Sequence, residues 1–157
     1  MITPAAQQRI LSLIDDARDH GATIVSGGTA SGSCIAPTII SNITPQMRLY
    51  AQESFGPVVT VEEFSEVSAA VESANSSPYA LSAAVFSQND RAARDLAGQI
   101  EAGMCHINGS TVHDEPQMPF GGLKDSGWGR FGGDAAVAEF TELRWITSQA
   151  GHREYAF

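Results

Sequence analysis

The sequence lacks any long apolar run and is poor in positive charge. No stretch approaches the roughly eighteen uninterrupted apolar residues that a membrane-spanning helix needs. The first residues, 1–4, have neither the basic region nor the apolar core of a secretory signal. Nine Lys and Arg stand against eighteen Asp and Glu, and the resulting net charge of -9 repels phosphate backbones. These absences exclude a membrane span, argue against nucleic acid as a partner and predict a cytoplasmic protein.

Cysteine is scarce as well. The two cysteines, Cys34 and Cys105, form neither a disulfide framework nor a Cys-x-x-Cys metal knuckle, which agrees with a reducing compartment. A nucleophilic cysteine needs an activating base or a helix N-terminus beside it. Cys34 falls between a loop and the start of a predicted strand, and Cys105 falls inside an apolar strand. We therefore interpret both cysteines as structural and assign no catalytic residue.

Histidine and acidic residues gather in one segment, where His106 is followed by His113, Asp114 and Glu115. These side chains are of the kinds that bind metal ions, but their spacing matches no common metal site. A solvated or hydrogen-bonded loop is the better interpretation. The sequence therefore predicts no metal centre.

What is present is the composition of a packed chain, with 43% apolar and 17% charged residues over 157 positions. Thr3 and Pro4 are typical of a helix start, and apolar residues three to four apart predict an amphipathic helix that ends at Gly21. A short strand over 23–25 and a second strand over 35–40 follow, separated by a loop rich in glycine and serine.

The middle of the chain alternates between strand and helix patterns. Strands are predicted over 58–64, 81–86 and 104–107, and helices over 66–74 and 91–101. Ser65 and Asn89 stand where helix N-caps belong. This order predicts an α/β fold with a parallel β-α-β-α-β segment and right-handed crossovers.

A long stretch over 109–132 has no regular period, and long ordered loops are usually functional. Residues 127–132 satisfy the G-x-G-x-x-G pattern of phosphate-binding loops, but a loop rich in proline and glycine precedes them instead of a strand. We therefore interpret these glycines as permitting a backbone path. A short helix over 134–139 and a strand over 141–147 follow, and that strand needs a partner.

The segment before the strand at 58–64 combines a carboxylate, an aromatic ring and a rigid turn. Glu53 could accept hydrogen bonds from the hydroxyls of a ribose, and Phe55 could lie against a flat ring. The alternative is a surface glutamate beside a core phenylalanine. Spacing alone favours this alternative.

Four motifs together resemble the NAD(P)-dependent aldehyde dehydrogenase family. Residues 53–58 match E-x-F-G-P-V, and residues 74–83 match A-N-x-x-x-Y-G-L-x-A with Ala80 in place of the usual glycine. Residues 101–103 match E-A-G, and residues 119–130 match P-F-G-G-x-K-x-S-G-x-G-R. The resemblance covers nearly the whole chain and corresponds to the C-terminal third of a family member. The loop over 108–118 is most similar to the salicylaldehyde, vanillin and benzaldehyde dehydrogenases, which implies aromatic aldehydes as substrates.

The resemblance implies a role for each matching residue. Glu53 and Phe55 would bind the nicotinamide end of NAD or NADP, and Phe120 and Asn108 would lie on the substrate side. Residues 1–140 would be the C-terminal part of the catalytic domain. Residues 141–157 would be an oligomerisation strand and tail, which implies a homo-oligomer.

The resemblance also implies what this chain does not supply. The family's nucleophilic cysteine, glutamate base and oxyanion-hole asparagine belong to motifs that we expect upstream of Met1, as does most of the cofactor domain. We therefore expect a C-terminal fragment that is inactive alone, binds no cofactor tightly and meets an aldehyde only in the full-length context. The alternative is a noncatalytic assembly module that associates with itself or with full-length subunits.

Overall fold

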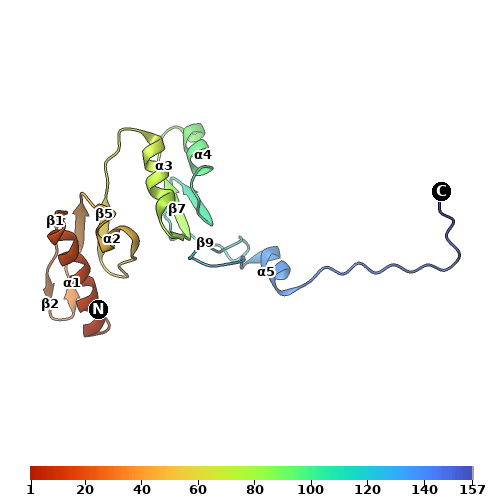
Figure 1. Ribbon diagram of the computed structural model, residues 1–157, viewed down its shortest axis with the longest axis horizontal. Coiled ribbons are helices and arrows are strands. Elements are labelled where there is room, and N and C mark those ends of the chain that lie inside the picture. The colour runs from red at the N-terminus through yellow and green to blue at the C-terminus, as the bar shows by residue number, and fades with distance from the viewer. Residues whose placement is uncertain (157) are drawn as a thin grey trace.

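The computed structural model describes residues 1–156, which form two small α/β units in series, then a short helix and an extended tail (Figure 1). The first unit holds α1, α2 and the strands β1 to β5, and the second holds α3, α4 and the strands β6 to β9. In chain order the elements are α1 (Pro4–Asp19), β1 (Thr23–Ser26), β2 (Ala30–Ser31), β3 (Cys34–Ile35), β4 (Thr38–Ser41), α2 (Arg48–Ala51), β5 (Val58–Val61), α3 (Val67–Ser76), β6 (Tyr79–Ala80), β7 (Ser82–Val85), α4 (Asp90–Ala97), β8 (Met104–Ile107), β9 (Leu123–Lys124) and α5 (Gly133–Phe140).

Helix α1 begins and ends where the sequence predicts. The Thr3 hydroxyl accepts a hydrogen bond from the Ala6 backbone N–H at 3.1 Å, and Pro4 occupies the first turn. At the other end Gly21 has a φ of +95°, a conformation that favours glycine. One face of α1 packs on the first sheet and supplies much of the core, in which the buried residues are Ile10, Leu13, Ile14, Ala17, Ile35, Ile40, Met47 and Leu49.

The first sheet has the order β1-β4-β5, with β1 antiparallel and β5 parallel to β4. The strand predicted over 35–40 is divided in two, because β3 pairs with β2 in a small hairpin and β4 starts at Thr38. Pro37 separates the two strands and has no N–H to donate to a ladder. Part of the predicted loop before them is therefore strand β2.

The predicted α/β class with parallel strands is confirmed. Strands β7 and β8 are parallel, and α4 connects them, as the pattern of the sequence indicates. The three predicted strands of the β-α-β-α-β segment do not form one continuous sheet, because β5 pairs with β4 and not with β7. The periodicity of a segment identifies a strand but not its neighbour in the sheet. The first and second parallel pairs therefore lie in separate sheets.

Two helix ends differ from the sequence-based prediction. Asn89 is the N-cap of α4, and its side chain accepts a hydrogen bond from the Ala92 N–H at 3.1 Å, as predicted. Ser65 is not the cap of α3, because that helix begins at Val67 with Glu66 as its cap residue. Helix α4 is shorter than predicted and ends at Ala97, since the following residues form tighter turns.

The long irregular stretch folds back on the second unit. Strand β9 pairs with β6, and Phe120 and Phe131 form an isolated bridge before α5 begins. Residues 141–156 run away from both units as an extended chain with no ladder partner among the described residues (Figure 1). The predicted strand over 141–147 is thus unpaired here, and Phe157 of the predicted tail lies outside the described residues. None of the described helices has both the length and the apolarity to cross a bilayer.

Candidate functional site

Lys124 connects the motifs of the second unit through hydrogen bonds and an ion pair. Its ammonium group donates to the carbonyl oxygens of Asn75 at 2.6 Å and Ser77 at 3.3 Å, and it pairs with the Glu101 carboxylate at 2.9 Å. Its charge strengthens these hydrogen bonds. One side chain therefore joins the end of α3, the turn before β8 and the loop that carries β9.

Two further side chains connect backbone segments of the same unit. The Asn75 amide accepts from the Glu101 N–H at 2.8 Å and donates to the Gln99 carbonyl at 2.8 Å. The Ser126 hydroxyl accepts from the Ala80 N–H at 2.9 Å. These residues stand in the motifs that carry the resemblance, and their side chains hold backbone segments together.

Gly103 and Gly121 allow two backbone segments to come into direct contact. A Cβ atom at Gly103 would lie 1.8 Å from the carbonyl oxygen of Gly121, and one at Gly121 would lie 2.5 Å from the oxygen of Gly129. The Arg130 guanidinium donates to the carbonyls of Gly122 at 2.9 Å and Gly129 at 2.7 Å. This packing sets the position of the loop beside β8.

In the G-x-G-x-x-G segment the glycines permit backbone conformations that other residues rarely adopt. Gly127, Gly129 and Gly132 all have positive φ angles. The carboxylate of Glu139 in α5 lies against Gly129 and accepts a hydrogen bond from the Arg130 N–H at 3.1 Å. A carboxylate therefore occupies the position beside these glycines where an anion such as phosphate would have to bind.

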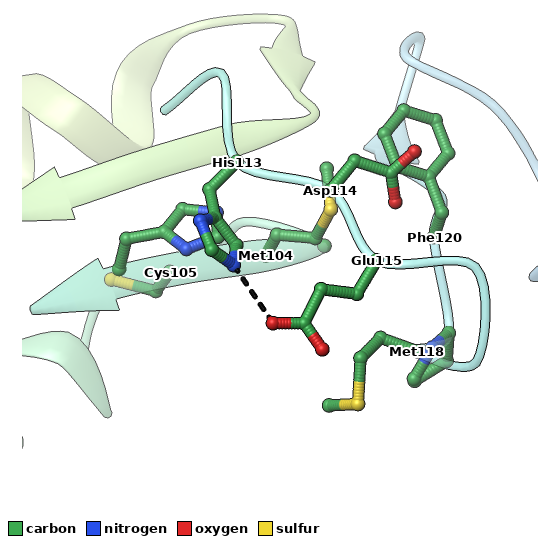
Figure 2. A pocket seen from close by; sticks show the side chains of 10 residues that line it. Met104, Cys105, His113, Asp114, Glu115, Met118 and Phe120 are labelled. Atoms are coloured by element: carbon green, nitrogen blue, oxygen red, sulfur yellow. Dashed lines mark hydrogen bonds and ion pairs between the residues drawn. The ribbon is translucent and has the colours of Figure 1, made fainter. Parts of the chain in front are cut away.

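A cavity of about 390 Å³ lies between β8 and the loop that follows it (Figure 2). Met104 and Cys105 line it from β8, and Met118 and Phe120 line it from the loop. The residues that line it are Gly103, Met104, Cys105, His106, His113, Asp114, Glu115, Met118, Pro119 and Phe120. Of the predicted site residues, Phe120 is the one that the structure brings to this cavity.

The cavity has a mixed polar and apolar wall. His113 and Glu115 face each other, with 3.3 Å between Nε2 and Oε1 (Figure 2), and Gln117 also donates to Glu115. The rings of His106 and His113 have centroids 5.5 Å apart. In the described part of the chain, Nε2 of His106 is buried and has no hydrogen-bond partner. Residues 113–115 thus belong to a hydrogen-bonded loop, as the sequence predicts, and they line a cavity together with His106 of β8, a role that the sequence did not indicate.

Asn108 follows β8 directly but does not line the cavity. Its side-chain amide accepts from the Ser87 N–H at 2.8 Å and donates to the Ser87 carbonyl at 2.9 Å. Its backbone has a φ of +54°, a region that asparagine tolerates better than most residues. The predicted place of Asn108 on the substrate side stays a prediction, and the structure places its amide against Ser87, just after β7.

Glu53 and Phe55 lie in the turn between α2 and β5, in the first unit. Phe55 is 80% exposed and has a φ of +49°. The Arg9 guanidinium of α1 donates to the carbonyls of Glu53 and Ser54 and thereby holds the turn against α1. The Glu53 carboxylate is exposed as well. Neither residue lines the cavity near Phe120, so the structure does not unite the two predicted pairs in one site.

The family follows from comparison with known proteins. Residues 1–146 match the model of the aldehyde dehydrogenase family. The chain belongs to the aldehyde dehydrogenase family. The resemblance that the four motifs carry is therefore confirmed.

Individual aldehyde dehydrogenases similar to this chain include three with aromatic substrates in their names. A vanillin dehydrogenase of Pseudomonas fluorescens is 50% identical over 99% of the chain and 32% of the relative. A benzaldehyde dehydrogenase [NAD(+)] of Pseudomonas putida is 36% identical over 95% of the chain and 31% of the relative. The crystal structure of a salicylaldehyde dehydrogenase from Pseudomonas putida, complexed with salicylaldehyde, superposes with a TM-score of 0.91 at 42% identity, covering 100% of this chain and 32% of that one.

The chain therefore spans about a third of the length of these aldehyde dehydrogenases. Within this third, the structure shows the chemical character of both cysteines. Burial raises the pKa of the Cys105 thiol, which keeps it in the weakly nucleophilic thiol form. Cys34 is exposed in the two-residue strand β3, away from the cavity lining. The interpretation of both cysteines as structural stays a prediction.

Proposed function

We propose that this chain is the substrate-facing and cofactor-supporting C-terminal part of an aromatic-aldehyde dehydrogenase, which oxidises an aldehyde to a carboxylic acid with NAD(P). The cavity between β8 and the following loop carries the proposal. Its size falls in the range of small-molecule sites, and Met104, Met118 and Phe120 give it apolar walls. An aromatic ring fits this environment better than a charged aliphatic chain does. The 50% identity to a vanillin dehydrogenase supports the same substrate class.

The cofactor site is proposed for the turn at Glu53 and Phe55. When bound, NAD(P) supplies the acceptor for the hydride. The exposed Glu53 carboxylate can accept hydrogen bonds from ribose hydroxyls, and the exposed Phe55 ring offers a face to the nicotinamide. Arg9 holds the backbone of this turn on α1 through its bonds to two carbonyls. These residues fit a supporting role, and we expect this chain alone to bind the cofactor weakly.

The covalent step needs a thiolate that this chain does not offer. An aldehyde carbon is attacked by a thiolate, and the thiol of Cys105 stays protonated because burial raises its pKa. Cys34 has no place in the cavity wall. We propose that residues 1–157 have no dehydrogenase activity alone and that both free cysteines fit the reducing cytoplasm.

A complementation assay tests this function. The chain is mixed with a truncated salicylaldehyde dehydrogenase of Pseudomonas putida that lacks the matching third, and NADH formation is measured with salicylaldehyde. We expect activity from the mixture and none from either part. As a control, Phe120→Ala should reduce activity more with benzaldehyde than with a small aliphatic aldehyde. Activity of the chain alone that is lost in Cys34→Ala or Cys105→Ala would contradict the proposal.

The extended tail favours a second role, in assembly. Leu143, Trp145 and Ile146 are between 78% and 106% exposed, although they are large apolar side chains. Exposed apolar strands with unpaired backbone groups tend to pair with another chain. We propose that residues 141–157 are an oligomerisation strand and tail and that residues 1–140 belong to the catalytic domain.

Light scattering on the chain and on a variant that ends at Phe140 tests the assembly role. We expect the intact chain to form dimers or larger homo-oligomers and the shortened variant to be monomeric. Leu143→Lys should weaken association without affecting the two α/β units. A chain that remains monomeric at high concentration and does not bind a full-length relative would exclude this role.

A further inference from the structure

We propose that Asn108 is a positioning residue, whose side-chain amide fixes the first residues of the substrate loop to Ser87, just after β7, and thereby places the cavity wall at His113 and Met118. The substrate loop is residues 109–118. The inference rests on the proposed function, because it gives a role to the loop of that same cavity. It assigns to Asn108 an indirect action on the substrate in place of a direct contact.

Asn108 forms three hydrogen bonds at the open end of the β7–β8 pair. Its backbone N–H donates to the Val85 carbonyl at 2.8 Å, which extends the parallel ladder by one rung. Its side chain then bonds both the N–H and the carbonyl of Ser87, at 2.8 and 2.9 Å. The amide thus pairs with a backbone segment much as another peptide group would. A side chain with only an acceptor or only a donor cannot form both bonds.

The attachment point on Ser87 is itself held in place. The Ser87 hydroxyl accepts from the Asn89 N–H at 3.0 Å, and Asn89 is the N-cap of α4. Helix α4 covers both β7 and β8 (Figure 1). A displacement of Asn108 would therefore have to disturb the start of a packed helix. This makes Ser87 a rigid base for the loop.

A second bond holds the loop farther along. The Ser82 hydroxyl, at the first residue of β7, donates to the Thr111 carbonyl at 3.0 Å. The loop is therefore attached near Ser87 at one end of β7 and at Ser82 at the other, so it runs back along this strand. Two residues after Thr111 it reaches the cavity at His113. The two attachments therefore determine where the loop reaches the cavity and forms its wall.

Apolar packing restrains this part of the loop little, and in the described part of the chain its other hydrogen bonds join residues within the loop itself. Residues 110–118 are all exposed, so apolar packing contributes little to their order. A loop that is ordered only on substrate binding weakens that binding, because the entropy of ordering is lost at that step. Asn108 should therefore act on KM more than on kcat.

Hydrogen exchange on the 157-residue chain tests the attachment. Asn108→Gly keeps the positive φ accessible and removes both side-chain bonds. The matched control is Asn42→Gly, because Asn42 has a similar φ of +59° and its amide bonds Thr23 in the first sheet. We expect the Ser87, Val112 and Met118 amides, which donate hydrogen bonds at the attachment and in the loop, to exchange about tenfold faster in Asn108→Gly and at an unchanged rate in Asn42→Gly. Asn108→Asp, which can still accept from the Ser87 N–H, should be intermediate.

The complemented enzyme tests the positioning. In Asn108→Gly we expect KM for salicylaldehyde to rise about tenfold with kcat within about twofold, and KM for a small aliphatic aldehyde to change much less. Unchanged exchange in the loop would overturn the inference, as would faster exchange with an unchanged KM. An equal loss for both aldehydes together with a lower Tm would show a merely structural residue and would also overturn it. If the unaltered chain fails to complement, the proposed function fails, and exchange then decides on the attachment alone.

Discussion

Replacing Gly103 by alanine should strongly destabilise the second α/β unit. Gly103 directly precedes β8, and its backbone N–H donates to the Ala80 carbonyl at 3.0 Å. An added Cβ would lie 1.8 Å from the carbonyl oxygen of Gly121 and 3.0 Å from Cα of Gly122. Because these atoms belong to backbone and not to a flexible side chain, no rotamer change can relieve the clash. The two segments must separate by roughly 1.5 Å to restore normal contact.

The magnitude follows from the kind of contact that is lost. Inserting a methyl group into a packed site costs about 1–3 kcal/mol, and a clash between two backbone segments belongs at the upper end of this range. Separation also weakens the cavity wall, because Gly103 lines the cavity together with Phe120. For a chain of this length, a loss of about 3 kcal/mol lowers Tm by about 6–12 °C.

Thermal unfolding followed by circular dichroism measures this effect. The matched control is Gly98→Ala at the end of α4, where an added Cβ would meet its nearest atom at an ordinary 3.5 Å and φ is −68°. Alanine there should be neutral or slightly stabilising, because it reduces the entropy of the unfolded chain. A Tm for Gly103→Ala within about 2 °C of the unaltered chain would refute the reasoning from close backbone contact.

Three further outcomes follow from the structure. Lys124→Met should lower the free energy of unfolding by about 2 kcal/mol in urea titrations, because three acceptors lose a charged donor, and Lys124→Arg should recover part of it. Since its raised pKa keeps Cys105 protonated to a higher pH, iodoacetamide should alkylate it more slowly than free cysteine at mildly alkaline pH, and unfolding in urea should abolish the difference by mass spectrometry. Replacing Asp114 and Glu115 together by Asn and Gln should raise kcat/KM of the complemented enzyme for 4-carboxybenzaldehyde relative to benzaldehyde about threefold, because both carboxylates line the cavity and repel an anionic substrate.

The elements of the fold could largely be predicted from local patterns. The cap at Thr3, the N-cap Asn89 and the parallel pair joined by α4 all follow from residues close in the sequence. The partner of β5 could not be predicted in this way, because the choice between β4 and β7 depends on packing between distant segments. The hairpin of β2 and β3 could not be predicted from periodicity, because each strand has only two residues.

The cavity was predicted less completely than the fold. Phe120 was identified through the family motif, whereas the lining by Met104, His106 and Met118 was missed. Their common signal is position, since a long ordered loop directly after a parallel strand returns across that strand's end. Asn108 was assigned to the substrate side from its place in the sequence, but its two bonds to Ser87 depend on where β7 ends. No local pattern contains that information.

Most residues of the family motifs and the loop residues that face the cavity have different roles in this structure, although Gly103 and Phe120 belong to a motif and also line the cavity. Lys124, Gly103 and Gly121 hold backbone segments in contact, so that most replacements there disturb the fold itself. His113 and Met118 stand on an exposed loop and face the cavity, so that replacing them costs the fold little. Exchanging residues 109–118 for those of a relative with another substrate should therefore change the preference among aldehydes in the complemented enzyme while leaving Tm unchanged. A fall in Tm as large as that expected for Gly103→Ala would show that the loop also holds the fold together.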